Sequence, residues 1–400
     1  MIILPPFTDR PTPRPYARAT RLAPWTATDH SERPPFDKRS LPFLPHFVPL
    51  SGTLMTWTEL DWSALDRLRQ KFLSSTPGAA AGVYWENPAD LSSYDFTYGE
   101  RIGWKWDHVL RELRLRNWQP ATTTRSVFDW GCGSGVAARR VISFFGAEKF
   151  DTLTVWDHSR LACDYAASAA QAAFPSLRVS IASPALSSPL SALSSSGSIG
   201  LLLISHVLNE LSPDALATLL TLVARAEAVL WVEPGTHAVS RHLGSLREKL
   251  LATASFRLVA PCTHQNTCPI LAPEHTRDWC HHFAPPPSEI FANPDWVKFG
   301  QRAGIDLRSL PYAFLALDRL RDAPPPPADL ARVIGRPEHF KPYVRLLSCD
   351  SSGLAELELP KRTDLALFKH LDRTKAPLLY HWRHDGHKIL AGTPVAPPSV

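Results

Sequence analysis

The stretch SVFDWGCGSGVAARRVISFFG, residues 126–146, decides the fold of this chain. The segment SVFDW is typical of a buried strand, and VAARRVISFFG is typical of a helix. Between them, Gly131, Gly133 and Gly135 allow a sharp turn and let the backbone approach a ligand closely. The N-terminus of the following helix offers free N–H groups to an anionic group. The stretch therefore predicts a strand–loop–helix unit with a binding loop.

Strand and helix patterns alternate on the C-terminal side of this unit. IGLLLIS (199–205) is continuously apolar, as in a strand that is buried on both faces. The alternation predicts an α/β, Rossmann-like fold with an open, mostly parallel sheet and helices on both faces. Besides 126–130 and 199–205, strands are predicted at 152–157, 178–183, 228–233, 256–261 and 312–319, and intervening helices at 136–146, 214–226, 235–254 and in the Ala-rich run to Ala173.

The pattern divides the 400 residues into four parts. Hydrophobic residues make up 44% of the chain and charged residues 20%, so most of it is expected to fold around cores. Its 38 prolines gather in extended or linker segments, including 324–327. We expect a Pro/Arg-rich arm (1–50), a helical N-terminal region (51–120), a sheet domain (121–320) with a Cys-rich insert at about 262–311 and a surface loop at 181–198, and a small β-containing C-terminal module (330–400) with a hairpin turn at 351–353.

The glycine loop favours one class of cofactor. A dinucleotide-binding loop would have a third glycine where this chain has Val136, which argues against an NAD-type oxidoreductase. The D-x-G-x-G-x-G form is that of S-adenosylmethionine-dependent methyltransferases. Asp157 ends the second strand, where an acid can bind ribose hydroxyls. The predicted cofactor-binding residues are Asp129, Gly131, Gly133, Gly135 and Asp157; the alternative is a glycine turn that serves tight packing only.

The segment ISHVLNEL supplies candidate catalytic residues after the fourth strand. Helical spacing would place His206, Asn209 and Glu210 near one face. Asn209 could orient a substrate amine, and Glu210 could act as a general base. The alternative is that these residues cap a helix and make structural hydrogen bonds. Whether the chain catalyses methyl transfer stays open at this point.

Four cysteines form a candidate metal site. Cys262, Cys268 and Cys280 lie within nineteen residues, and Cys349 follows on the predicted hairpin. Their spacing does not fit the close cysteine pairs of zinc fingers, whereas iron–sulfur clusters accept irregular spacings and prefer four thiolates. The remaining alternatives are zinc, with His264, His281 or His282 as ligands, and no metal. Cys132 and Cys163 are predicted to be buried thiols.

Together these motifs resemble one known family. DWGCGSG, SHVLNEL, VEPGT, VAPCTHQNTCP, DWCHHF and LLSC…LPKR occur in this order over about 125–362. The chain resembles the methyltransferase-like proteins of the small ribosomal subunit, best known from mitochondria, and we expect it to be a bacterial member. The resemblance implies a seven-strand methyltransferase sheet, S-adenosylmethionine at the glycine loop and a 4Fe–4S cluster on Cys262, Cys268, Cys280 and Cys349. It also implies binding to small-subunit ribosomal RNA in ribosome assembly or translation.

Charge and hydropathy narrow the choice of partners. The net charge of +5 and the Lys- and Arg-rich C-terminal module, which includes Arg332, Arg336 and Lys375, suit phosphates, although acids are interspersed. No apolar run is long enough to span a membrane, and the N-terminal segment makes a poor signal peptide. We expect a monomer, cytoplasmic in a bacterium and mitochondrial in a eukaryote. The alternative function is an active RNA or protein methyltransferase with a structural zinc site and no role in ribosome assembly.

Overall fold

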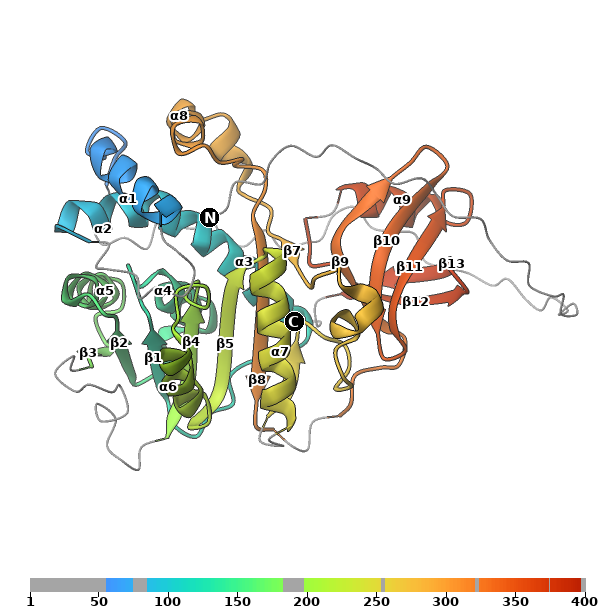
Figure 1. The fold of residues 1–400 in the computed structure, drawn as a ribbon, viewed down its shortest axis with the longest axis horizontal. Helices are drawn as coiled ribbons and strands as arrows, with labels where there is room; N and C mark the ends of the chain where they lie inside the picture. Colours follow the sequence, from blue (N-terminus) through green and yellow to red (C-terminus); the bar gives the residue numbers. More distant parts are fainter. Residues whose placement is uncertain are drawn as a thin grey trace, which may run out of the picture. The chain divides into compact units, whose positions relative to one another are not determined.

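A twisted sheet and a small barrel organise the chain (Figure 1). The computed structural model describes residues 55–74, 85–182, 198–252, 256–320, 324–373 and 375–396, which belong to one compact unit. The arm predicted at 1–50 and most of the loop predicted at 181–198 lie outside these ranges. None of the helices in the described part of the chain combines the length and apolar character needed to span a bilayer.

Eight strands form the sheet, seven of them along one path. Their order is β3 (Arg178–Ile181), β2 (Thr152–Trp156), β1 (Ser126–Trp130), β4 (Ile199–Ser205), β5 (Ala226–Pro234), β8 (Pro311–Asp318) and β6 (Arg257–Ala260). The short strand β7 (His282–Phe283) pairs with β8 off this path. The strands from β3 to β5 are parallel, and only β8 runs antiparallel to β5 and β6. The predicted α/β class with a mostly parallel sheet is confirmed.

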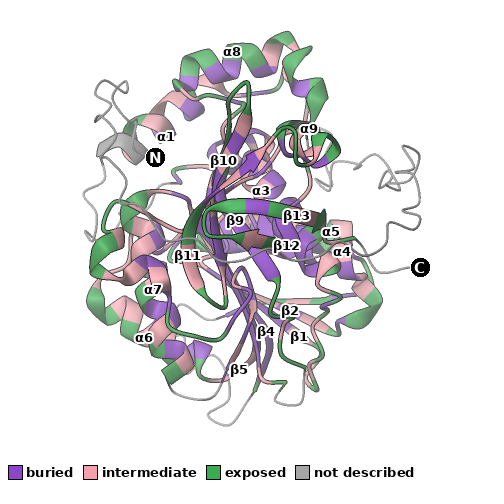
Figure 2. Ribbon diagram, turned by 90° about the vertical axis from the view of Figure 1, so that its right-hand side faces the viewer, coloured by how far each residue is buried: buried purple, intermediate pink, exposed green. Residues whose placement is uncertain are grey.

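Two hydrophobic cores cover the two faces of this sheet, because alternate residues of each central strand point to opposite faces. In β4, Leu201 and Leu203 belong to one core and Leu202 and Ile204 to the other. The first core packs against α3 (Glu100–Leu115), α4 (Val136–Phe145) and α5 (Arg160–Ala173), and the second against α6 (Pro213–Val223) and α7 (His237–Ala252). Helices α5, α6 and α7 bury the side that faces the sheet and expose their outer side, so buried and exposed residues alternate along them (Figure 2).

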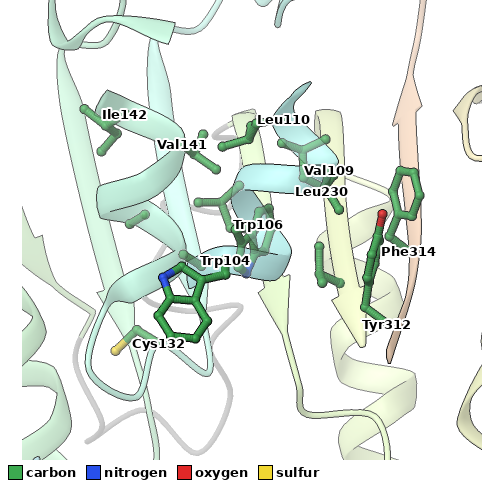
Figure 3. Close-up of a cluster of buried hydrophobic side chains, with 14 of the residues drawn as sticks. Trp104, Trp106, Val109, Leu110, Cys132, Val141, Ile142, Leu230, Tyr312 and Phe314 are labelled. Carbon is green, nitrogen blue, oxygen red and sulfur yellow. The ribbon is translucent and has the colours of Figure 1, made fainter. Parts of the chain in front are cut away.

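The N-terminal region is helical, as the sequence predicts. Helices α1 (Trp62–Ser74) and α2 (Pro88–Tyr94) precede a π-helical turn, Asp95–Gly99, which continues directly into α3. Trp104 and Trp106 of α3 are buried, so they serve packing. Figure 3 shows the side chains of α3, among them Trp106, between those of α4 and those of β8.

The connection between β6 and β8 contains the three clustered cysteines. It includes three short 3-10 helices (Pro269–Leu271, Pro273–His275 and Ser288–Phe291), the strand β7 and helix α8 (Pro294–Ala303). Asn293 caps α8 by accepting hydrogen bonds from the N–H groups of Asp295 and Trp296. The sequence pattern predicts neither β7 nor α8.

A closed five-stranded barrel follows the proline segment. Its strand order is β10 (Tyr343–Asp350), β11 (Gly353–Pro360), β13 (Lys388–Pro394), β12 (Leu379–Asp385) and β9 (Leu330–His339), with helix α9 (Leu365–Arg373) packed on it. The predicted hairpin is confirmed, since Asp350 pairs with Gly353 across the turn. Leu357, Trp382 and Ile389 belong to a separate core inside this module.

Candidate functional site

The sheet order creates a crevice beside the glycine loop. β2 and β4 lie on opposite sides of β1, so the direction in which strands are added reverses between β1 and β4. In open α/β sheets, ligands bind at the carboxyl ends of the strands at this switch point. The glycine loop follows β1, and the segment from His206 to Glu210 follows β4. The fold therefore brings both sequence-predicted segments to one edge of the sheet.

Each glycine of the loop has left-handed backbone geometry, but their surroundings differ. The φ angles of Gly131, Gly133 and Gly135 are 70°, 50° and 76°. A Cβ atom on Gly135 would come within 2.9 Å of Ala166 in α5, so this glycine serves close packing. A Cβ atom on Gly133 would meet nothing within 4 Å. Tight packing, the alternative to a ligand-binding role, therefore explains Gly135. Gly133 instead borders open space that a ligand could use.

Two acids hold the loop in place. Asp157 accepts hydrogen bonds from the N–H groups of Gly133 (3.0 Å) and Ser159 (2.9 Å). Burial raises the pKa of Asp157 above its usual value, and the two hydrogen bonds oppose this shift. Asp129 is fully buried and accepts from Ala138 N–H through one oxygen (3.3 Å), while its other oxygen has no partner among the described residues. Burial raises the pKa of Asp129 to about 7.

A buried ion pair braces the loop from the N-terminal side. Arg139 of α4 makes a bidentate contact with Asp95, with both N···O distances at 2.7 Å. The same guanidinium donates to the carbonyl of Ser134 inside the glycine loop (2.7 Å). Asp95 begins the π-helical turn, a feature that proteins often place at functional sites.

His206 lies at the crevice in a left-handed backbone conformation, with φ at 59°. Its Nε2 is 3.0 Å from Nζ of Lys105, and its Nδ1 is 3.3 Å from Oγ of Ser205. Burial and the neighbouring Lys105 lower the pKa of His206 well below its usual value, so the ring is neutral at pH 7. Burial, reinforced by Arg101, lowers the pKa of Lys105 to about 7. The sequence pattern gives no sign of this role for Lys105, because its partner His206 lies far along the chain and helix periodicity carries no signal for the contact.

The predicted helical face of His206, Asn209 and Glu210 is wrong. Residues 208–210 form a turn, with Glu210 N–H donating to the carbonyl of Val207, and α6 begins only at Pro213. Asn209 is exposed and Glu210 half-buried. Glu233, which sequence analysis did not single out, anchors this turn: its Oε1 accepts from the N–H groups of Val207 and Leu208 and from Trp231 Nε1. Burial raises the pKa of Glu233 to about 8.

The four cysteines of the candidate metal site come from two segments that lie side by side. Cys268 and Cys349 are buried in one cluster, against which Cys280 packs. The segment around Cys262 is tied to the end of β10, since Thr263 Oγ1 donates to the carbonyl of Cys349 (3.5 Å). All four are free thiols. The other two cysteines of the chain, Cys132 and Cys163, are buried elsewhere in the first core, as predicted.

The thiols influence one another electrostatically. Burial and then Cys262 raise the pKa of Cys268 to about 11, and the same two causes raise the pKa of Cys280 and of Cys349. Within the described ranges, no three His, Cys, Asp or Glu side chains converge closely enough to hold a metal ion.

Histidines flank the cysteines. His264 Nε2 lies 3.6 Å from Cys349 Sγ, and His282 Nε2 lies 3.8 Å from Cys280 Sγ. His281 instead stacks on Trp279, and its Nδ1 is 2.9 Å from the carbonyl oxygen of Trp279.

A buried charge cluster joins the barrel to α3 beside this site. Glu112 pairs with Arg116 of the same helical region (2.9 Å) and with Arg332 of β9. Arg116 also donates to the carbonyls of Val259, Pro261 and Cys262, so it fixes the start of the cysteine segment. The prediction that Arg332 offers its charge to phosphates is wrong, because Arg332 is buried and ion-paired with Glu112.

Comparison with known proteins gives one family match. The model of the family Rsm22, described as mitochondrial small ribosomal subunit Rsm22, matches residues 104–370. No curated protein matches the chain. Among solved structures, a putative RNA methyltransferase from Pyrococcus horikoshii is 9% identical, with 54% of this chain and 84% of that chain covered and a TM-score of 0.33. An O-methyltransferase family protein from Burkholderia thailandensis is 15% identical, with 67% and 71% covered and a TM-score of 0.35.

Proposed function

This chain belongs to the family of the mitochondrial small ribosomal subunit protein Rsm22, and we propose that it is an S-adenosylmethionine-binding, methyltransferase-like protein that acts on the small ribosomal subunit. The observation that carries the cofactor part is the crevice at the carboxyl ends of β1 and β4, where the glycine loop meets Asp157. The family match supports the ribosomal part.

The residues proposed to hold the cofactor are Asp129, Gly131, Gly133, Gly135 and Asp157. Asp157 keeps free lone pairs beside its two backbone hydrogen bonds, so it can accept hydrogen bonds from ribose hydroxyls. The open space beside Gly133 allows a ligand to approach the backbone, and the unpartnered oxygen of Asp129 can accept a further hydrogen bond. When bound, S-adenosylmethionine would supply an electrophilic methyl group.

A contact at the crevice favours methyl transfer as a second candidate function. Lys105 has a pKa of about 7, so much of its amine is neutral and able to accept a proton near neutral pH. His206 holds that amine at 3.0 Å. We propose Lys105 and His206 as the proton-handling pair, ahead of the exposed Asn209 and the half-buried Glu210. If methyl transfer occurs, replacing Lys105 with Met should abolish incorporation of labelled methyl into ribosomal RNA while cofactor binding persists.

We propose that Cys262, Cys268, Cys280 and Cys349 hold a 4Fe–4S cluster. Four free thiols from two adjacent segments supply the donor set that such a cluster prefers. The cluster would tie β10 of the barrel to the segment that follows β6, so its binding would be coupled to folding.

His282 would support the cluster from outside its ligand set. Its Nδ1 accepts a hydrogen bond from Arg332 Nε at 3.3 Å, and burial and Arg332 keep the ring neutral by lowering its pKa. The ring proton is then on Nε2, which lies 3.8 Å from Cys280 Sγ. A donor at this place would stabilise negative charge on the sulfur, as hydrogen bonds to ligand sulfurs do in iron–sulfur proteins.

The proposed partner is small-subunit ribosomal RNA. The chain carries a net charge of +5, and exposed cations of the barrel module such as Lys341, Lys361 and Arg362 can contact phosphates. We propose that the protein acts as a monomer, in the cytoplasm of a bacterium or in the mitochondria of a eukaryote. Its role would lie in assembly or translation.

Sedimentation tests this proposal. Full-length protein purified without oxygen is mixed with small or large ribosomal subunits and separated on density gradients at low and high salt. We expect it to migrate with small subunits at low salt and to be released at high salt, because phosphate contacts weaken steeply with ionic strength. Equal migration with both subunits, or with neither, would contradict the ribosomal part of the proposal and leave the cofactor part to be judged by cofactor binding.

A further inference from the structure

A cavity of about 400 Å³ lies between the sheet domain and the barrel. It is lined by α3, by β7 and the prolines after it, by β9 and by the segment that joins α9 to β12. None of its lining residues belongs to the glycine loop, to the turn at 206–210 or to the four cysteines. It is therefore a second candidate site, separate from the crevice and adjacent to the proposed cluster, with which it shares His282 and Arg332.

The floor of the cavity is polar and buried. It contains His108, His282 and Arg332, each at most 4% exposed. Arg332 is ion-paired with Glu112, and burial lowers the pKa of His108 to about 3, so the His108 ring is neutral at pH 7. His108 Nδ1 is 2.7 Å from the hydroxyl of Tyr312, whereas its Nε2 has no hydrogen-bond partner among the described residues. The floor thus contains a buried polar atom that a ligand could satisfy.

The rim of the cavity is cationic. Three exposed basic side chains, Arg308, Arg336 and Lys375, stand against the single carboxylate of Asp372. Arg336 is the cation that a ligand could use most readily, because it forms no ion pair within the described ranges, whereas Arg308 is bonded to Asp306. A phosphate would gain charge-assisted hydrogen bonds from the Arg336 guanidinium.

The wall is apolar. Phe283, Pro285 and Pro286 follow β7 along one side, and Val333 and Leu378 contribute from the barrel. The Arg336 guanidinium lies 3.9 Å from the centre of the Phe283 ring, so the cation stands directly over a flat aromatic surface. A cavity of this size exceeds the needs of a phosphate alone and falls within the usual range for small-molecule sites.

We propose that this cavity binds one nucleotide unit, with its phosphate on Arg336 and Lys375 and its base against Pro285 and Pro286. The flat proline rings offer an apolar surface to one face of a planar base, and apolar walls are usual in small-molecule sites. The bound nucleotide unit can come from two sources: a free mononucleotide or an unpaired nucleotide of an RNA strand. The RNA source rests on the proposed association with ribosomal RNA, whereas the mononucleotide source does not.

Calorimetric titration of the full-length protein distinguishes the sources. The probes are AMP, adenosine, inorganic phosphate and a short single-stranded oligouridylate. We expect AMP to bind more tightly than either adenosine or phosphate, because only AMP has both a phosphate for the cationic rim and a base for the apolar wall. Tight binding of the oligonucleotide with weak binding of AMP would assign the cavity to an RNA strand, and the reverse would assign it to a free nucleotide.

Matched variants locate the binding. Arg336→Gln should weaken the better of AMP and the oligonucleotide roughly tenfold or more, as expected for the loss of a charge-assisted hydrogen bond. Lys388→Gln removes the same charge from an exposed position of β13 outside the cavity and should change binding little. Binding of S-adenosylmethionine should be unchanged in both variants, so a failure of the cavity proposal can be distinguished from a failure of the cofactor proposal. Equal losses in the two variants, equal affinity for adenosine and AMP, or no binding of any probe at millimolar concentration would overturn the inference.

Discussion

Replacing Glu112 with Gln should strongly destabilise the contact between the sheet domain and the barrel. Glu112 is fully buried. Its Oε1 accepts hydrogen bonds from Arg116 Nε (3.0 Å) and Arg116 Nη2 (2.9 Å) and forms an ion pair with the guanidinium of Arg332. The variant leaves two guanidinium groups without their carboxylate, at side-chain exposures of only 9% and 3%. Removing one partner of a buried ion pair typically costs about 3–5 kcal/mol. Arg116 keeps three backbone carbonyl acceptors, so we expect about 3 kcal/mol.

Urea unfolding followed by tryptophan fluorescence and circular dichroism measures this loss. Glu338→Gln is the matched control, because it removes the same charge from an exposed pair with Arg345 and should cost less than about 1 kcal/mol. If Glu112→Gln does not fold, the double variant Glu112→Met with Arg332→Met keeps the test possible, since apolar replacement of a buried pair is often tolerated. A loss for Glu112→Gln no larger than that of the control would show that the ion pairs of Glu112 do not stabilise this contact.

Three further predictions concern the loop, pH and the cysteines. Gly135→Ala should lower the thermal stability more than Gly133→Ala, because both variants strain a left-handed residue but only the side chain added at position 135 collides with Ala166. Gly133→Ala should still weaken S-adenosylmethionine binding. Thermal melts measure the stability of both variants, and calorimetry measures their cofactor binding. Burial raises the pKa of Glu233 to about 8, so the stability that this group contributes is fully present below about pH 4.5 and is lost as pH rises through 8. The difference in free energy of unfolding between wild type and Glu233→Gln, measured with urea at several pH values, should therefore change over this pH range. A difference that is constant with pH would contradict this prediction. Cys349→Ser should lower iron content and loosen the barrel in limited proteolysis, and unchanged iron would remove Cys349 from the proposed ligands.

Most strands of the sheet could be predicted from the sequence because their signals are local, whereas the short strand β7 could not. β1 and β4 match the segments SVFDW and IGLLLIS residue for residue, since an apolar run bounded by loop residues marks a strand without reference to the rest of the chain. The hairpin at Ser351–Ser352–Gly353 was recognisable for the same reason. The closure of the barrel was not, because pairing of β9 with β12 and of β11 with β13 joins segments far apart in sequence.

The site was predictable in part. Glycine spacing and a strand-end acid predicted the neighbours Gly133 and Asp157, which the fold brings into hydrogen-bond contact. The turn at His206 was misjudged, because a left-handed residue and a turn precede α6, and spacing alone cannot distinguish a turn from a helix. Arg332 looked like a surface cation, since its ion-pair partner Glu112 lies on α3. Charges that pair across domains leave no pattern in the sequence.

Titration of S-adenosylmethionine into the protein is the most direct test of the proposed cofactor site. Asp157→Ala serves as the matched variant, and its folding is checked by circular dichroism. We expect one binding site per chain in the wild type and an affinity reduced roughly tenfold or more in the variant, because hydrogen bonds to a charged group are lost. Absence of binding to the wild type, or equal affinity in the two proteins, would contradict the claim that the crevice beside the glycine loop is a cofactor site.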